Sequence, residues 1–213
     1  DGTLETDAIT LGGVSFIKIE GTNFTDGLLI GHTTTGTLSS ASGNTGVGID
    51  AMDALTGGDD NTLVGYRSGS AVTGGSRNTY LGKDAGLLST TSVDNVAVGV
   101  SALDAVTTTT GGNTAVGSTA LSAVTDNFNI GIGYQAGDNI TSGAGNIIIG
   151  SADAGSATGD HQLKIAGYNG SSTVTWIDGD SSGNVTFPAE IDGATLDISG
   201  NADIDGTTNL DAV

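Results

Sequence analysis

The pattern Asn-x-x-(aliphatic)-Gly occurs seven times in the middle of this 213-residue chain, about every seventeen residues. The interval departs from 17 only around Asn113, where it is 18 before and 16 after. A weaker copy, Gly27–Gly31, precedes the first by one interval. Such a short fixed period predicts a stack of near-identical coils rather than a globular domain with one central core. The repeated residues are Asn44, Gly48, Asn61, Gly65, Asn78, Gly82, Asn95, Gly99, Asn113, Gly117, Asn129, Gly133, Asn146 and Gly150.

Alignment of the copies predicts which side chains face the interior of each coil. The fourth position is always aliphatic, the eighth is small in six copies, and the twelfth is mostly aliphatic. Because an even spacing in extended chain places side chains on one face, we expect positions 4, 8 and 12 to point inward. Glycine in every copy and β-branched residues at these sites disfavour a helix. The predicted fold is therefore all-β: a repetitive parallel β-roll or solenoid of about eight 17-residue coils.

Each coil has room for two short strands and two turns, and eight coils stacked at about 4.8 Å would form a body about 40 Å long. The invariant glycine predicts a positive φ or a close backbone approach. The invariant asparagine predicts a ladder of side-chain amides that bond to the coils above and below. Both columns are interpreted as structural, because a binding function would not need them in every coil.

The composition predicts self-association. Aromatic residues are 4% of the chain and there is no cysteine, so a thin interior of Val, Ala and Gly would lack both large side chains and disulfides. We therefore expect an obligate oligomer, a side-by-side or intertwined homotrimer, whose core forms between chains.

The charge excludes some partners. With 24 acidic residues against five basic ones, the net charge is −19, so the chain lacks the clustered cations that nucleic-acid binding needs. An acidic surface favours solubility and attracts divalent cations. No apolar stretch is long enough to span a membrane. The sequence starts without a methionine or a signal peptide, as expected of a processed product or an excised piece.

Four segments are expected along the chain. Residues 1–26 form an N-terminal stalk or leader with strands at 8–11 and 14–19, and residues 27–160 form the β-roll body. Residues 161–188 form a hairpin and strand module, with Tyr168-Asn169-Gly170 between its first two strands. Residues 189–213 form a C-terminal stalk of Asp-Gly modules. Because residues 1–9 match residues 205–213 in register, the chain was either cut from a longer fibre or continues head to tail.

Two segments carry a resemblance to known proteins. Residues 113–121 (NTAVGSTAL) and 129–137 (NIGIGYQAG) resemble the head repeats of trimeric autotransporter adhesins. That resemblance covers roughly residues 27–160 and implies a left-handed parallel β-roll of three chains. Residues 176–187 and the Asp-Gly modules are similar to tail-fibre proteins of bacteriophages, which often embed the same head repeats. Together they imply a virion fibre or a related extracellular filament.

No catalytic constellation is found, and we expect no enzyme activity. The two histidines, His32 and His161, lie in different modules, and no nucleophile elbow or dinucleotide fingerprint occurs. Asp178, Asp180 and Ser182 resemble the start of a calcium loop, but the twelfth position is Ala189 instead of Glu, so a tight turn is the favoured interpretation. No cofactor is expected, and Ca²⁺ is kept only as a weak alternative.

Exposed aromatic and cationic residues are the candidate receptor contacts. Tyr66, Arg67 and Tyr134 lie near predicted coil corners, as do Arg77 and Tyr80, and such residues are common in contact hot spots. The alternative role for these residues is packing between chains.

The predicted function is that of a structural fibre, most consistent with a virion tail fibre that presents a rigid adhesive rod to a host surface receptor or glycan. The expected location is the virion or the extracellular space. A head-to-tail cell-surface filament or adhesin is the alternative. A monomeric ice- or calcium-binding solenoid is the third hypothesis.

Overall fold

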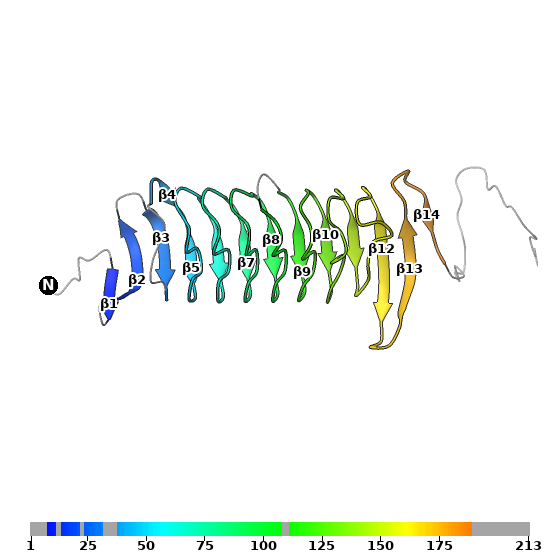
Figure 1. Cartoon of the computed structure of the whole chain (residues 1–213), viewed down its shortest axis with the longest axis horizontal. Helices are drawn as coiled ribbons and strands as arrows, with labels where there is room; N and C mark the ends of the chain where they lie inside the picture. The colour runs from blue at the N-terminus through cyan, green and yellow to red at the C-terminus, as the bar shows by residue number, and fades with distance from the viewer. Residues whose placement is uncertain (1–7, 12–13, 22–23, 32–37, 108–110, 189–213) are drawn as a thin grey trace, which may run out of the picture.

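The protein is an all-β solenoid of about eight turns with coils of about 17 residues (Figure 1). The computed structural model describes residues 8–11, 14–21, 24–31, 38–107 and 111–188. One 14-stranded sheet runs the length of the rod. Its strands are β1 (Ala8–Leu11), β2 (Val14–Gly21), β3 (Phe24–Ile30), β4 (Ala41–Ser42), β5 (Thr45–Val47), β6 (Thr62–Val64), β7 (Thr79–Leu81), β8 (Val96–Val98), β9 (Thr114–Val116), β10 (Ile130–Ile132), β11 (Ile147–Ile149), β12 (Leu163–Tyr168), β13 (Thr173–Gly179) and β14 (Val185–Thr186).

Strands β5 to β11 are parallel and in register, so residues at the same repeat position lie side by side. Strand β3 joins this stack in parallel to β5, and β12 joins it in parallel to β11. Antiparallel pairs end the sheet, β1–β2–β3 at one end and β12–β13–β14 at the other. The expected strands at 8–11 and 14–19 and the hairpin after residue 161 are thus confirmed. The hairpin continues the sheet of the solenoid.

Two details of the coil differ from the sequence-based expectation. Each coil carries one three-residue strand, not two, and the rest of the coil consists of turns and bends. The third repeat position, at the middle of the strand, points inward and is fully buried in Leu63, Tyr80 and Ile148. Because neighbouring residues of a strand face opposite sides, the aliphatic fourth position points outward, so its predicted inward orientation was wrong. Positions 8 and 12 face inward as predicted in the first six repeats, whereas Asp153 and Ala157 of the last repeat are not buried.

The chain encloses its own core, contrary to the expectation that a core forms only between chains. The interior is also larger than a filling of Val, Ala and Gly would give. Third and ninth positions of one coil complement each other in size, with Leu63 facing Gly69 and Ala97 in the same coil as Leu103. The largest buried side chains are Tyr80, Leu29, Met52, Leu55, Leu63, Leu103, Leu121, Ile140 and Ile148.

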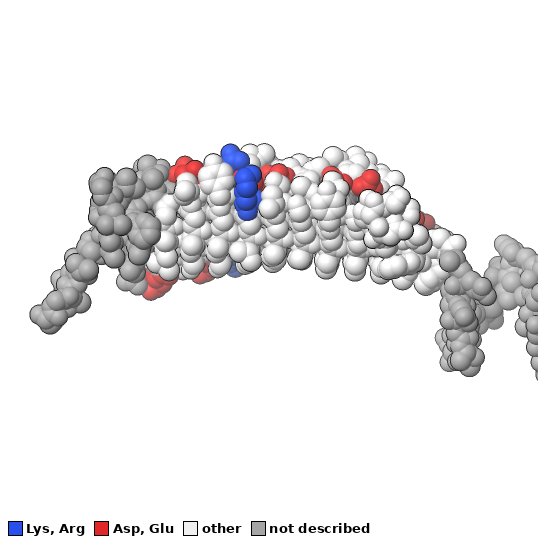
Figure 2. All heavy atoms as spheres, turned by 90° about the horizontal axis from the view of Figure 1, so that it is seen from below, with Lys and Arg blue, Asp and Glu red and all other residues white. Residues whose placement is uncertain are grey.

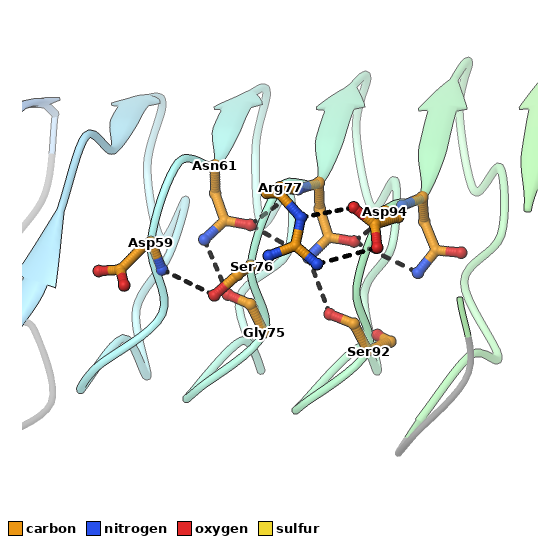
Figure 3. A network of polar contacts seen from close by, with 9 residues as sticks. Asp59, Asn61, Gly75, Ser76, Arg77, Ser92 and Asp94 are labelled. Carbon is orange, nitrogen blue, oxygen red and sulfur yellow. Dashed lines mark hydrogen bonds and ion pairs between the residues drawn. The ribbon is translucent and has the colours of Figure 1, made fainter. Parts of the chain in front are cut away.

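The seven asparagines form a buried amide ladder along the rod (Figure 3). Asn61 Oδ1 accepts from both the backbone N–H and Nδ2 of Asn78, each at 3.0 Å. Asn61 Nδ2 donates to Asn44 Oδ1 at 2.9 Å and to the carbonyl of Gly75, in its own coil, at 2.8 Å. The Asn61 side chain therefore ties neighbouring coils together and closes the turn of its own coil.

The ladder ends on a different residue. Gln162 occupies the asparagine column after Asn146, and its backbone N–H and Nε2 both donate to Asn146 Oδ1, at 2.8 and 3.1 Å. Its Nε2 also donates to the carbonyl of Gly159 at 2.8 Å. The longer glutamine side chain thus makes the same set of bonds at the transition from the coils to β12.

The invariant glycine comes directly after the strand, at a turn whose backbone conformation is unfavourable for other residues. Gly65 has a φ of 139°, and a β-carbon there would overlap the carbonyl of Gly82 in the next coil. The chain then passes through left-handed conformations at positions 7 and 9, as in Thr119 (φ 54°) and Leu121 (φ 50°). These turns reverse the chain within a few residues and so set the short coil.

Several expected features lie outside the described residues. They include residues 1–7, the proposed C-terminal stalk at 189–213 and hence the two matching end segments, and most of the Thr107–Thr110 insertion.

Candidate interaction surface

The outward face of the parallel strands carries an uninterrupted aliphatic column. In-register pairing places the fourth-position side chains of adjacent coils next to each other, for example Val64 beside Leu81 and Leu81 beside Val98. All seven are partly or largely exposed, and Leu81 is 48% exposed. We call this set the lateral column: Val47, Val64, Leu81, Val98, Val116, Ile132 and Ile149.

The lateral column widens toward the C-terminal end of the stack. There the second position, which also points outward, changes from threonine in β5 to β7 to isoleucine in Ile130 and Ile147. Ile147 and Ile149 are each more than one third exposed. In soluble proteins, exposed apolar surfaces larger than scattered single side chains are typical of interaction sites.

Charged residues are sparse on the part of the rod toward which the strands point. Figure 2 shows this side, where a broad surface is free of charged atoms, acidic groups lie toward its margins and one prominent basic group lies near the upper margin. Because the chain has a net charge of −19, a contact with another acidic surface costs least where charged groups are few.

Two of the three candidate receptor contacts lie together. The Arg67 guanidinium lies over the Tyr66 ring, 5.2 Å from its centroid, and Arg67 Nε donates to Asp84 Oδ1 at 2.7 Å. Lys83 pairs with the other oxygen of Asp84. The hydrogen bond from Arg67, followed by that from Lys83, lowers the pKa of the buried Asp84. Arg67 is thus held by an internal ion pair as well as being partly exposed.

Tyr134 occupies the same repeat position as Tyr66 but lies four coils away, roughly 19 Å at the usual strand spacing. It borders a different hollow, of about 370 Å³, together with Asp138, Asp153 and Tyr168. Burial, followed by a hydrogen bond with Asp153, raises the pKa of Asp138. The structure therefore does not bring the three candidate contacts into one site.

Tyr80 and Arg77 differ from the expectation that both lie at exposed corners. Tyr80 is fully buried inside its coil, where its hydroxyl lies 2.9 Å from Ser89 Oγ, so its expected surface role was wrong. Arg77 is exposed and forms a bidentate ion pair with Asp94, at 2.6 and 2.9 Å (Figure 3). A sequence signal for the buried tyrosine exists in Gly86, six residues later, which leaves space for the ring.

Asp180 and Ser182 of the calcium-like segment lie in the turn between β13 and β14, whereas Asp178 lies in β13. Asp180 Oδ1 accepts the backbone N–H groups of Ser182 and Asn184, at 2.9 and 3.0 Å, and its Oδ2 accepts Asn184 Nδ2 at 2.8 Å. These bonds, led by that from the Asn184 side chain, lower the pKa of Asp180. Asp178 instead lies 4.0 Å from Lys164.

Among the described residues, no group of three or more His, Cys, Asp or Glu side chains is arranged to hold a metal ion. Of the two histidines, His161 is exposed at a coil corner, and His32 lies outside the described part.

Comparison with known proteins gave no match, whether to a protein-family model, a curated protein or a solved structure. In the part of the chain that the structure describes, no helix is long and apolar enough to cross a membrane.

Proposed function

We propose that this chain is the structural subunit of an attachment fibre, a virion tail fibre or a related extracellular fibre, in which three copies associate along their lateral columns. The lateral column carries this proposal, because it runs through all seven repeats and leaves aliphatic side chains in water in a single chain. Burying the remainder of seven such side chains would contribute on the order of 5 kcal/mol per chain.

A trimer suits the shape of this surface. The lateral column is narrow, one or two side chains wide, and several narrow strips meet well around a shared axis. Closed rotational symmetry then covers every strip without leaving a surface for further growth. The resemblance of residues 113–121 and 129–137 to trimeric adhesin heads agrees with the same number of chains.

The rod would act by presentation. The amide ladder and the backbone bonds between coils link each coil to the next, which favours a stiff body that holds receptor-binding surfaces away from a particle or cell. A host surface receptor or glycan is the partner in this proposal, and its location is the virion or the extracellular space.

The proposal is tested by absolute mass in solution, measured by light scattering behind a sizing column. We expect the mass of three chains for the wild type and of one chain for Ile132→Glu, which places a charge in the lateral column. Ser142→Glu, an exposed position in the same coil, is the matched control and should keep the mass of three chains. Circular dichroism verifies that both variants remain folded.

A wild type with the mass of one chain would refute the association and favour the monomeric ice- or calcium-binding solenoid. A mass that grows with protein concentration would instead support the head-to-tail filament suggested by the match between residues 1–9 and 205–213.

A further inference from the structure

The hairpin at the C-terminal end of the stack carries an aromatic hollow that the lateral column does not include. Strands β12 and β13 extend past the outline of the coils (Figure 1). Near the tip of this hairpin, six residues line a hollow of about 360 Å³: Gly167, Tyr168, Asn169, Ser172, Val174 and Trp176. This volume lies at the lower end of the range for small-ligand sites, about 300–1,000 Å³.

Trp176 packs against the neighbouring strand at Gly167, where the absence of a side chain leaves space for the indole ring. Gly167 pairs with Val174, and a β-carbon on Gly167 would lie 2.5 Å from Cζ2 of the indole. The six-membered ring therefore rests over the Gly167 backbone, yet 56% of Trp176 remains exposed. Tyr168, on the same hollow, is 51% exposed. Two aromatic side chains thus line one hollow with much of their surface in water.

The polar groups of the hollow are uncharged and available. Asn169 Oδ1 accepts the backbone N–H groups of Ser171 and Ser172, both at 3.0 Å, which fixes the amide in the turn. Within the described residues, Asn169 Nδ2, Ser172 Oγ, Tyr168 Oη and Trp176 Nε1 make no hydrogen bond. No Lys, Arg, Asp or Glu lines the hollow. Neutral donors and acceptors therefore surround an aromatic surface.

We propose that this hollow binds a neutral saccharide, with one pyranose ring against Trp176 and its hydroxyls bonded to Asn169 and Ser172. A pyranose has an apolar face of C–H groups that packs on the electron-rich face of an aromatic ring, while its edge needs hydrogen-bonding partners. The hollow offers both, and its volume accommodates a pyranose ring. The net charge of −19 disfavours acidic sugars, since the field of the chain repels anions.

The proposal adds a ligand class to the attachment role and rests on that role only for its biological meaning. Sugar binding is a property of one hairpin and is measured whatever the number of chains in the assembly. A second copy of the chain is the competing occupant, because Val185 and Phe187 are exposed at the same end. Light scattering on every variant distinguishes these cases.

Trp176 is the only tryptophan of the chain, so its fluorescence reports on this site alone. We would titrate the full chain with glucose, galactose, mannose, N-acetylglucosamine and lactose, and confirm binding by saturation-transfer NMR. We expect a saturable change in emission with at least one of these sugars, with a dissociation constant in the millimolar range. NMR on Trp176→Ala should show binding lost or weakened at least about tenfold.

Two further variants distinguish a loss of sugar binding from a loss of folding. Gly167→Ala retains the fluorophore but displaces the indole from the strand, so it should weaken binding by about tenfold or more. Phe187→Ala removes an exposed aromatic outside the hollow and should bind like the wild type. The proposal is overturned if none of the five sugars changes the emission, or if Trp176→Ala still binds. It is also overturned if Trp176→Ala lowers the mass of the assembly, which would assign the hollow to contact between chains.

Discussion

The ring of Tyr80 occupies the space that a β-carbon on Gly86 would need. Both residues lie in one coil, at the third and ninth repeat positions, and the pair is the largest-with-smallest case of a size relationship found in other coils. Gly46 is followed by Met52 and Ala97 by Leu103, so a small third residue accompanies a large ninth one. The coil that begins at Asn129 is an exception: it has Gly131 and Gly137 at these positions, and Leu121 and Ile148 of the neighbouring coils fill the space beside them.

This relationship predicts that exchanging the large and the small residue between the third and ninth positions is tolerated better than changing either residue alone. Tyr80→Ala should cost about 4 kcal/mol of unfolding free energy because it leaves a cavity. Gly86→Leu should prevent normal packing of the coil, since the new side chain overlaps the ring. In the double variant, which reproduces the pair Ala97 and Leu103, Tyr80→Ala should recover much of the loss caused by Gly86→Leu. Urea unfolding of the four proteins measures the coupling, and strictly additive effects would contradict the size relationship.

Much of the fold follows from the repeat itself. The period and the parallel stack could be predicted because a fixed interval with a glycine and an asparagine in each copy leaves few alternatives to a solenoid. The hairpin could be predicted from Tyr168-Asn169-Gly170 between two strand-like segments. Positions 8 and 12 were placed correctly in the first six repeats, since a constant small or aliphatic character at a fixed repeat position indicates an interior site.

The orientation of position 4 could not be obtained from even spacing. That rule requires continuous extended chain, but the strand ends after Val64 and the chain turns at Gly65 and again at Arg67, which has a φ of 52°. The inward residue is Leu63, the strand centre, whose column contains Gly, Leu, Tyr, Ala and Ile and so shows no constant character. The aromatic hollow was missed because Gly167 and Trp176 come together only through the hairpin register.

The amide ladder predicts that the unfolding free energy lost when one amide is removed depends on the position of that amide along the rod. Asn61→Leu removes the acceptor of the buried Asn78 N–H and the donor to Gly75 and Asn44. We expect a loss of about 4 kcal/mol of unfolding free energy, because several buried polar groups lose partners at once. Gln162→Leu, at the half-buried end of the same ladder, should cost about 1 kcal/mol. Chemical denaturation measures both values, and equal losses would show that the ladder is not a chain of linked buried bonds.

The left-handed turns predict a substitution that stabilises the protein. Thr119 has a φ of 54°, a left-handed conformation that costs a β-branched residue at least about 1 kcal/mol. Thr119→Gly should therefore raise the unfolding free energy by up to about 1 kcal/mol, despite the greater freedom that glycine gives the unfolded chain.

Ser118, the preceding residue, is the control for this substitution because its φ is not positive. Ser118→Gly should lower stability by up to about 1 kcal/mol, since here glycine only adds freedom to the unfolded chain. Thermal and urea unfolding of both variants give the comparison. A stabilising effect of both, or of neither, would show that strain at Thr119 does not determine its contribution.

The carboxyl pair of Asp138 and Asp153 predicts a pH dependence. Burial, and then the hydrogen bond with Asp153, raises the pKa of Asp138 in the folded chain. The native state therefore holds this proton more tightly than the unfolded state. Its contribution to the unfolding free energy is most favourable below the ordinary pKa of about 4 and falls as the pH rises from there through the raised value. Asp138→Asn should remove this fall, and Asp153→Asn should reduce it, because burial of Asp138 remains.

The measurement is the unfolding free energy from pH 3 to pH 8, taken as the difference between each variant and the wild type so that the other carboxyls cancel. Asp180→Asn is a control of opposite sign. Hydrogen bonds led by Asn184 lower the pKa of Asp180, so its stabilisation is present above the ordinary pKa and is lost as the pH falls through the lowered value. The difference curve for Asp138→Asn should rise with pH and that for Asp180→Asn should drop with pH. A flat curve for Asp138→Asn would show that the pKa of Asp138 is not raised in the folded chain.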